Sequence, residues 1–413
     1  MRVPHTNIGS HMLRWVSSGA ILASTVLVST LATPTAGHAT DTVPTDQDGR
    51  WVAMGDSFQS GVGTGNYRDD SGDCLRSPES HLELLSADGT LPTDLEHVAC
   101  SGARIDDLYD GRHGEPPQLD ALTTETQDIS HVSVGIGGND LDFADNLRDC
   151  ILQGWPWSSC ESRLGEDVEA NFADLMDQNP DGLNTFQQLF TDIQDATGPQ
   201  DTDLLTFTYP KFFPPDGGSD WSSLPLQPRC QGIRISDQLW INNSIQRLNS
   251  AIIDSAHSVD ATPVDLYEAS EGHELCHPDG NDDYLNGIEL NSEAFHPTEF
   301  GYDRNATQIR DELDEPSNIS VPLRTGDVAL PEPPQAEVSL DQDGDTVTVA
   351  ASESVPGDGA IDTHLWEFDD GELIDAAQAS HTYDEPGTYN VTLTVIDSNE
   401  EMGFSEPHEV VVE

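Results

Sequence analysis

The first part of the chain alternates short apolar runs with longer stretches of helical periodicity. The runs at residues 51–54, 131–136 and 204–209 are nearly continuous in apolar residues, and each is followed by a glycine or a proline. The clearest helix, residues 237–257, carries apolar residues on one face, at Ile241, Ile245, Leu248 and Ile252. Buried strands that alternate with amphipathic helices predict an α/β fold with a parallel sheet. In such sheets, functional residues lie beyond the carboxyl ends of the strands.

The pattern changes near the end of this first domain, which we place at residues 47–312. Residues 313–335 are rich in proline, which predicts an extended linker. Within residues 336–413, apolar and polar residues alternate with a period of two, at 337–340, 346–349 and 389–395. This alternation predicts a second domain built as an antiparallel β-sandwich.

The N-terminus has the pattern of a secretion signal. Arg14 precedes an apolar run at residues 19–32, and small residues then lead to a plausible cleavage site at residues 37–39. The run is too short to be a good membrane span. Residues 9–12 read as the scar of an expression tag, unless Met12 is the true start. We therefore expect residues 1–39 to be a signal peptide and the mature protein to be extracellular.

The net charge of the chain limits the classes of partner that it could bind. The chain has 76 acidic and 16 basic residues, for a formal net charge of -60, and a single lysine, Lys211. A nucleic-acid binder needs a cationic surface, so this composition excludes that class, and it disfavours charge-driven binding to anionic membranes. With 35% hydrophobic residues, the chain is expected to fold rather than to be disordered. Such acidity predicts a protein adapted to molar salt, where carboxylate repulsion is screened.

Six cysteines fit an exported protein, because an even number in an oxidising compartment predicts disulfides. Their connectivity is open at this point. A rival interpretation groups His273, Cys276, His277 and Asp279 into a metal site, but the usual zinc spacing is absent. The acidic loop at residues 341–345 lacks the EF-hand pattern and is expected to be a solvated turn.

Candidate catalytic groups follow the apolar runs. Ser57 comes directly after the first run, on a predicted strand-to-helix turn whose backbone N–H groups could stabilise an oxyanion. Gly102 and Asn139 could supply further donors, from a short loop and from the end of the second run. His296 lies in a polar loop with Glu293 three residues before it, and a nucleophilic serine needs both a base and a group that orients the base.

In order and spacing, these residues resemble the SGNH (GDSL) hydrolase superfamily. The four blocks read GDSFQSG at 55–61, ACSGA at 99–103, GGND at 137–140 and FHP at 295–297. The resemblance implies a flavodoxin-like α/β/α sandwich and an acyl-enzyme mechanism without metal or cofactor. Ser57 would be the nucleophile and His296 its base. The backbone N–H groups of Ser57 and Gly102, with the Asn139 amide, would form the oxyanion hole.

The cysteines and the GHELC segment at 272–276 resemble the secreted actinobacterial esterase and lipase branch. That branch implies three sequential disulfides, which here would be Cys74–Cys100, Cys150–Cys160 and Cys230–Cys276. The superfamily usually has aspartate three residues before the histidine, where this chain has Glu293. We expect either its carboxylate, with a slight preference, or a backbone carbonyl to orient His296.

The second domain resembles a PKD domain, an immunoglobulin-like module common in secreted hydrolases. The matching segments are WEFDDG at 366–371, HTY at 381–383 and PGTYNVTLTV at 386–395. The resemblance implies a spacer, or a module that docks on a polymer or a surface, without catalysis.

The sequence therefore predicts a monomeric, secreted, salt-adapted serine esterase or lipase that acts on a lipid or small acyl ester. A carbohydrate acetylesterase or a phospholipase of the same superfamily is an alternative within the enzyme class. The contrasting alternative is a non-catalytic polymer-binding surface protein, against which the four blocks argue.

Overall fold

The computed structural model describes residues 49–123, 129–142, 160–198, 202–215, 217, 234–277, 283–287, 293–314, 332–370, 372–399 and 401–413. The predicted signal peptide lies outside these residues, as do residues 315–331 of the predicted linker. Cys150, Cys230 and Asp279 also lie outside them.

A five-stranded parallel sheet, in the order β2-β1-β3-β4-β5, forms the centre of the first region. Its strands are β1 (Arg50–Gly55), β2 (Asp94–His97), β3 (Ile129–Gly135), β4 (Asp203–Phe207) and β5 (Thr262–Val264). The three predicted runs fall on β1, β3 and β4, and the last run extends two residues past its strand. The parallel α/β sheet is thus confirmed, with the strand order of flavodoxin-like folds.

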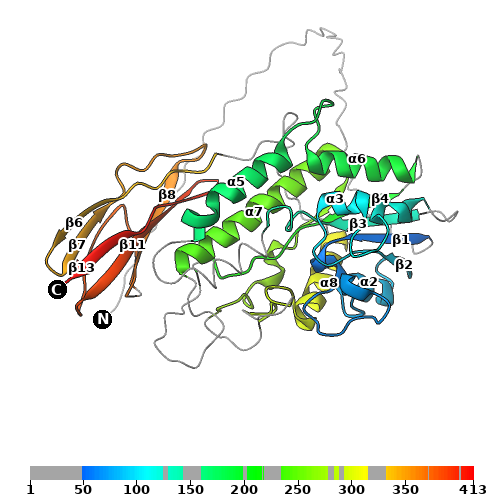
Figure 1. Ribbon diagram of the computed structural model, residues 1–413, viewed down its shortest axis with the longest axis horizontal. Helices are drawn as coiled ribbons and strands as arrows, with labels where there is room; N and C mark the ends of the chain where they lie inside the picture. The colour runs from blue at the N-terminus through cyan, green and yellow to red at the C-terminus, as the bar shows by residue number, and fades with distance from the viewer. Residues whose placement is uncertain are drawn as a thin grey trace, which may run out of the picture. The chain divides into compact units, whose positions relative to one another are not determined.

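Helices cover both faces of the sheet, because alternate side chains of each strand point to opposite sides. Val52 and Met54 of β1 belong to one apolar cluster, and Trp51 and Ala53 to the other. The first cluster is covered by α3 (Ile105–Asp110), α5 (Cys160–Met176), α6 (Thr185–Thr197) and α7 (Ile235–Ser258). The second is covered by α2 (His81–Asp88) and α8 (Glu299–Asp314). Figure 1 shows α6 above the sheet and α2 and α8 below it, which makes three layers.

Helix α7 contains the helix predicted at 237–257, and it positions the segment that follows β4. Its apolar side chains are buried as expected, but so are two asparagines. Asn242 Oδ1 accepts hydrogen bonds from the backbone N–H groups of Phe212 and Phe213, both at 3.1 Å. Asn249 binds both the N–H and the carbonyl of Tyr209, at 3.0 and 2.7 Å. These bonds satisfy backbone groups that a buried loop would otherwise leave unpaired.

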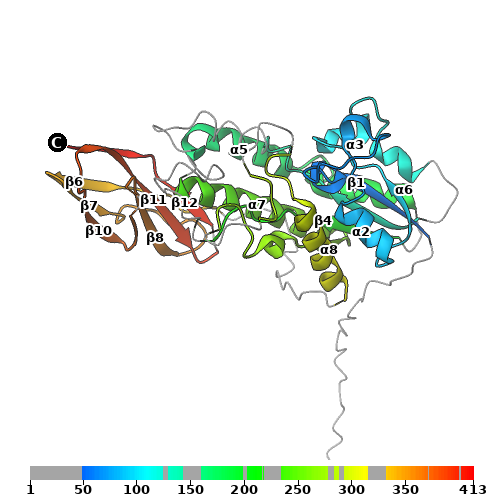
Figure 2. The same cartoon turned by 90° about the horizontal axis from the view of Figure 1, so that it is seen from below.

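The C-terminal region is an all-antiparallel sandwich, as predicted (Figure 2). One sheet joins β6 (Ser339–Asp343), β7 (Thr346–Ala350) and β10 (Gln378–Thr382). The other joins β8 (Ile361–Phe368), β9 (Leu373–Asp375), β11 (Gly387–Asp397), β12 (Met402–Phe404) and β13 (His408–Val412). Trp366 and Phe368 are fully buried between the sheets, where Val347, Leu393 and Val395 join them.

Candidate active site

Ser57 lies at the sharp turn between β1 and the short helix α1 (Ser57–Ser60). Asp56 caps this helix, since its Oδ1 accepts a 2.9 Å hydrogen bond from the Phe58 N–H. Gly55 has a φ of 134°, and a Cβ there would lie 2.2 Å from the Gly135 carbonyl oxygen. Only glycine therefore fits at the turn. This geometry places Ser57 at the carboxyl edge of the sheet.

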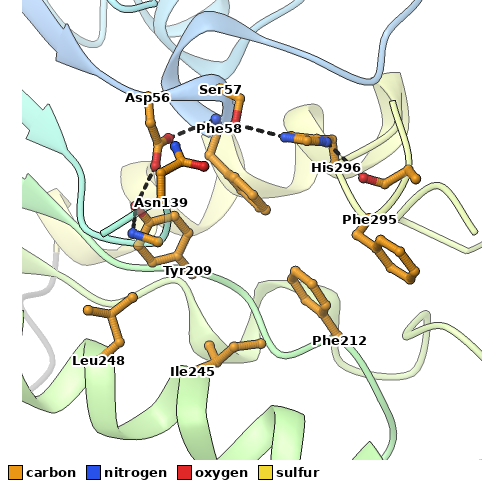
Figure 3. Close-up of a pocket in the computed structure, with 12 residues that line it drawn as sticks. Asp56, Ser57, Phe58, Asn139, Tyr209, Phe212, Ile245, Leu248, Phe295 and His296 are labelled. Carbon is orange, nitrogen blue, oxygen red and sulfur yellow. Dashed lines mark hydrogen bonds between the residues drawn. The ribbon is translucent and has the colours of Figure 1, made fainter. Parts of the chain in front are cut away.

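His296 reaches Ser57 from the other end of the domain, before α8. Its loop pairs with residues 285–286: Phe295 N–H donates to the Asn286 carbonyl at 2.9 Å, and Asn286 N–H donates to the His296 carbonyl at 2.8 Å. The Asn286 side chain also donates to the Gly63 carbonyl, at 2.8 Å, which ties the loop to the serine side of the site. His296 Nε2 then lies 2.8 Å from Ser57 Oγ (Figure 3).

The environment of His296 keeps its ring neutral. Burial lowers the pKa of His296 from 6.5 to about 4, because the charged imidazolium loses its hydration. The Nδ1 atom lies 2.9 Å from the Ala294 carbonyl oxygen, an acceptor that requires the proton on Nδ1. The lone pair of Nε2 therefore faces the serine hydroxyl, as a general base requires.

The acceptor at Nδ1 differs from our preferred expectation, which was the carboxylate of Glu293. Glu293 Oε1 instead accepts a 2.9 Å hydrogen bond from the Tyr67 hydroxyl. That hydroxyl in turn accepts from the Gly63 N–H at 3.1 Å. Here the carboxylate ties down the loop after α1, and a backbone carbonyl two residues before His296 orients the ring.

The two other expected oxyanion donors lie on adjoining loops. Asn139 follows β3 and lines the same cavity as Ser57 and His296. Its Nδ2 donates one proton to the Ala103 carbonyl at 2.9 Å, which leaves the second proton of that amide for another acceptor. Gly102 precedes Ala103 and has a φ of 72°, in a turn closed by the Ala103 N–H and the Cys100 carbonyl at 3.1 Å. Gly102 is not among the residues that line the cavity.

The cavity beside Ser57 is lined mainly by apolar side chains. They come from three places: Phe58 in α1, Tyr209 and Phe212 after β4, and Ile245 and Leu248 on α7. Ala294 and Phe295, which directly precede His296 in the chain, also line it, and Figure 3 shows Phe295 beside His296. Sequence reasoning assigned Ile245 and Leu248 to a buried helical face but not to a binding cavity, and it gave Phe212 no role.

Asp56 is a buried carboxyl group. It belongs to the serine motif, but the motif does not predict which residue it contacts. Burial raises the pKa of Asp56 from 3.8 to about 7, while a hydrogen bond from Tyr209 opposes that rise. The Tyr209 hydroxyl donates to Asp56 Oδ2 at 2.6 Å. The two residues are 153 positions apart in the chain.

The described cysteines bear on two other expectations, the disulfides and the rival metal site. Cys74 and Cys100 form a disulfide, and Cys160 and Cys276 are also disulfide-bonded. Their expected partners Cys150 and Cys230 lie outside the described residues. Because Cys276 is in a disulfide, it is not a thiolate ligand for the rival metal site. No cluster of three or more potential metal ligands occurs among the described residues.

Comparison with known proteins matches both regions of the chain. A model of the GDSL-like lipase/acylhydrolase family matches residues 53–304, and a model of the PKD domain matches residues 331–412. Lipase 1 of Streptomyces coelicolor is 33% identical over 282 residues, which cover 68% of this chain and 92% of that protein. A lipase of Streptomyces rimosus is 28% identical over 290 residues, covering 69% of this chain and 94% of that protein. The crystal structure of the extracellular lipase of S. rimosus superposes with a TM-score of 0.51 and 28% identity, over 64% of this chain and 99% of that one.

Proposed function

Since this chain belongs to the GDSL-like lipase/acylhydrolase family, we propose that it is a secreted serine hydrolase of carboxylic esters in which Ser57 carries the acyl group and His296 is the base. The observation that carries the proposal is the 2.8 Å contact between His296 Nε2 and Ser57 Oγ, two buried side chains that line a mainly apolar cavity. We assign catalysis to residues 47–312, which a linker at 313–335 joins to the PKD domain at 336–413.

The mechanism uses two proton transfers through one imidazole. Ser57 Oγ attacks the ester carbonyl while His296 Nε2 takes its proton. The negative oxygen that forms is stabilised by the N–H groups of Ser57 and Gly102 and by the second proton of Asn139 Nδ2. The imidazolium then protonates the alcohol oxygen as the C–O bond breaks, which leaves an acyl-serine. Water, deprotonated by the same Nε2, hydrolyses the acyl-serine and restores the hydroxyl.

The Ala294 carbonyl fills the place of the third triad member in this proposal. It holds the Nδ1 proton and so fixes the tautomer that leaves Nε2 free to accept. A carbonyl dipole stabilises the imidazolium less than a full negative charge would. The low dielectric around these buried groups strengthens the interaction between that dipole and the imidazolium.

The apolar lining of the cavity favours a fatty acyl group over a small acetyl group. Phe58, Phe212, Ile245 and Leu248 offer aromatic and aliphatic surface next to the nucleophile, and transfer of each CH₂ onto such surface contributes about 0.8 kcal/mol. We therefore propose a lipid or medium-chain acyl ester as substrate, in preference to an acetylated sugar.

A fluorophosphonate probe followed by a substrate panel tests the function. The mature protein should be labelled at Ser57, as read by peptide mass spectrometry, and should hydrolyse p-nitrophenyl octanoate with a higher kcat/KM than the acetate. Phospholipid and acetylated xylan complete the panel. An unlabelled protein would support the non-catalytic alternative, and preference for acetylated xylan would overturn the acyl-group proposal.

Glu293→Gln should lower kcat by less than about 10-fold, against the ~10⁴-fold loss seen when a serine protease loses its dedicated aspartate. Glutamine keeps an oxygen that can accept from Tyr67, and the Ala294 carbonyl remains at His296 Nδ1. The measurement is steady-state hydrolysis of a soluble ester beside the wild type. A loss as large as that of His296→Ala would instead make the Glu293 carboxylate the orienting group.

Secretion is proposed from the signal-like residues 1–39, the disulfides and the extracellular lipase of S. rimosus, which this chain resembles. In the part of the chain that the structure describes, there is no helix with the length and hydropathy of a membrane span. The PKD domain is proposed to dock on a polymer or a surface.

Adaptation to salt is proposed from the net charge of -60. Raising NaCl from 0.1 M to 1 M shortens the Debye length from about 10 to about 3 Å, which weakens repulsion among surface carboxylates in the folded state. The melting temperature should therefore rise, by roughly 2–4 °C for each kcal/mol gained. Sorbitol at equal osmolality is the control, because it is not ionic. A melting temperature that stays flat or falls in NaCl would exclude salt adaptation.

A further inference from the structure

One hydroxyl group joins the loop that carries the nucleophile to the loop that carries the amide donor. The Tyr209 hydroxyl donates to Asp56 Oδ2 at 2.6 Å and accepts from the Gly138 N–H at 3.0 Å. Asp56 directly precedes Ser57, and Gly138 directly precedes Asn139. Figure 3 shows Tyr209 next to Asn139 and below Asp56. None of the four sequence blocks contains this residue.

The position of the Tyr209 hydroxyl is fixed by contacts on all parts of the residue. Asn249 of α7 binds both its backbone N–H and its carbonyl. The ring packs edge-on against Phe58, with the ring centroids 5.1 Å apart and the planes at 82°. The residue is 5% exposed. Because these contacts already restrict the movement of the Tyr209 hydroxyl, that hydroxyl can hold the groups that bind it in a fixed position.

The electrostatics of the bridge favour the same arrangement. Burial, and then the Asp56 carboxylate, raise the pKa of the Tyr209 phenol well above 10, so the phenol keeps its proton and remains a donor. Asp56 is the acceptor of that proton, and its other oxygen holds the Phe58 N–H. The carboxylate therefore connects the Tyr209 hydroxyl to the first turn of α1.

We propose that Tyr209 is a positioning residue for ester hydrolysis, whose hydroxyl sets the Gly138–Asn139 loop relative to Ser57. It does not touch the reacting atoms. It acts through Asn139. It holds the loop at a distance from Ser57 that lets the second proton of Asn139 Nδ2 form a hydrogen bond with the oxyanion. This inference rests on the proposed function, in which Asn139 is an oxyanion donor.

Tyr209→Phe removes the hydroxyl and keeps the ring, so the packing on Phe58 remains. We expect kcat for a soluble ester to fall about 10- to 100-fold, the range for loss of a buried hydrogen bond to a charged group, with KM nearly unchanged. Affinity for an alkylboronic acid, which forms a tetrahedral adduct on serine, should fall in parallel. The control is Tyr109→Phe, which also removes a hydroxyl bound to a carboxylate, that of Asp192 at 2.8 Å, but at a 38% exposed site.

A double-mutant cycle with Asn139→Ala separates positioning from general structural damage. If Tyr209 acts through Asn139, Tyr209→Phe should cost less than about 3-fold in the Asn139→Ala background, because the two effects are not additive. Additive losses, or an unchanged kcat in the single variant, would overturn the proposal. If Tyr209→Phe does not fold, Asp56→Asn disturbs the other end of the bridge, and the same cycle decides. A wild type that neither reacts with fluorophosphonate nor hydrolyses esters would instead refute the proposed function itself.

Discussion

Replacing Ser57 or His296 by alanine is expected to lower kcat for a soluble ester by on the order of 10⁵- to 10⁶-fold, comparable to the loss of either group in a serine protease. The reason is geometric. Ser57 Oγ and His296 Nε2 are 2.8 Å apart, so each is the other's partner in a single proton transfer. Without the base, the hydroxyl stays protonated at neutral pH and is a poor nucleophile.

The double variant should be no slower than either single variant, since the pair acts as one unit. Melting temperature and active-site labelling accompany the kinetics. His296→Ala should also lose fluorophosphonate labelling, because the probe needs an activated oxygen. The matched control is Ser86→Ala on α2, a buried serine whose hydroxyl donates to the Pro92 carbonyl at 3.1 Å. Turnover within about 10-fold of wild type in either active-site variant would refute the mechanism, as such residual rates are far above those left by binding and the oxyanion hole alone.

The central strands could be predicted from the sequence because they are buried on both faces. Burial makes β1, β3 and β4 read as nearly continuous apolar runs. The outer strands gave no such signal. β2 reads Asp-Leu-Glu-His and is only partly buried at the sheet edge, and the short β5 contains Pro263. Edge strands tolerate charge and proline, which removes the pattern on which the prediction depends.

The contact between Ser57 and His296 could be predicted for a different reason, namely that a motif with fixed residue types surrounds each of the two residues. The orienting group could not be predicted in that way. Every residue has a backbone carbonyl, so no residue type marks Ala294 as the acceptor at His296 Nδ1. Glu293 had the expected position, but its oxygen binds Tyr67, a residue 226 positions away in the sequence.

The contacts of Tyr209, which position other residues, could not be predicted from the sequence either. Tyr209 is the last residue of the apolar run at 204–209 and lies just after β4, at the carboxyl edge of the sheet. Its partner Asp56 is 153 positions away, and no local periodicity reports a contact of that kind. The proposed catalytic residues could therefore be found from sequence motifs, while the residues that hold them in place could be found only from the folded structure.

Asn139→Ala should lower kcat by about 100- to 1000-fold, the cost of removing one oxyanion donor, with little change in KM. The amide is placed for this role by two contacts of its own loop: Asn139 Nδ2 donates to the Ala103 carbonyl at 2.9 Å, and Asp140 Oδ1 accepts from the Ile105 N–H at 3.1 Å. Both tie the loop to the segment that carries Gly102. A preorganised donor stabilises charge that exists only in the transition state, so its removal acts on kcat rather than on substrate binding.

Two further variants sharpen this prediction. Asn139→Asp has the same shape but replaces the donor with a negative charge, so it should be at least as slow as Asn139→Ala. Asn179→Ala removes a half-buried amide in the turn before α6, where it donates to Gln188 at 2.6 Å, and should leave kcat unchanged. The decisive measurements are kcat and fluorophosphonate labelling. Both are compared between the Asn139 variants and His296→Ala. If Asn139→Ala kept wild-type kcat, the oxyanion would have to be held by the backbone N–H groups of Ser57 and Gly102 alone. A rise in KM at constant kcat would instead make Asn139 a substrate-binding residue, because uniform binding changes KM without changing the rate of the chemical step.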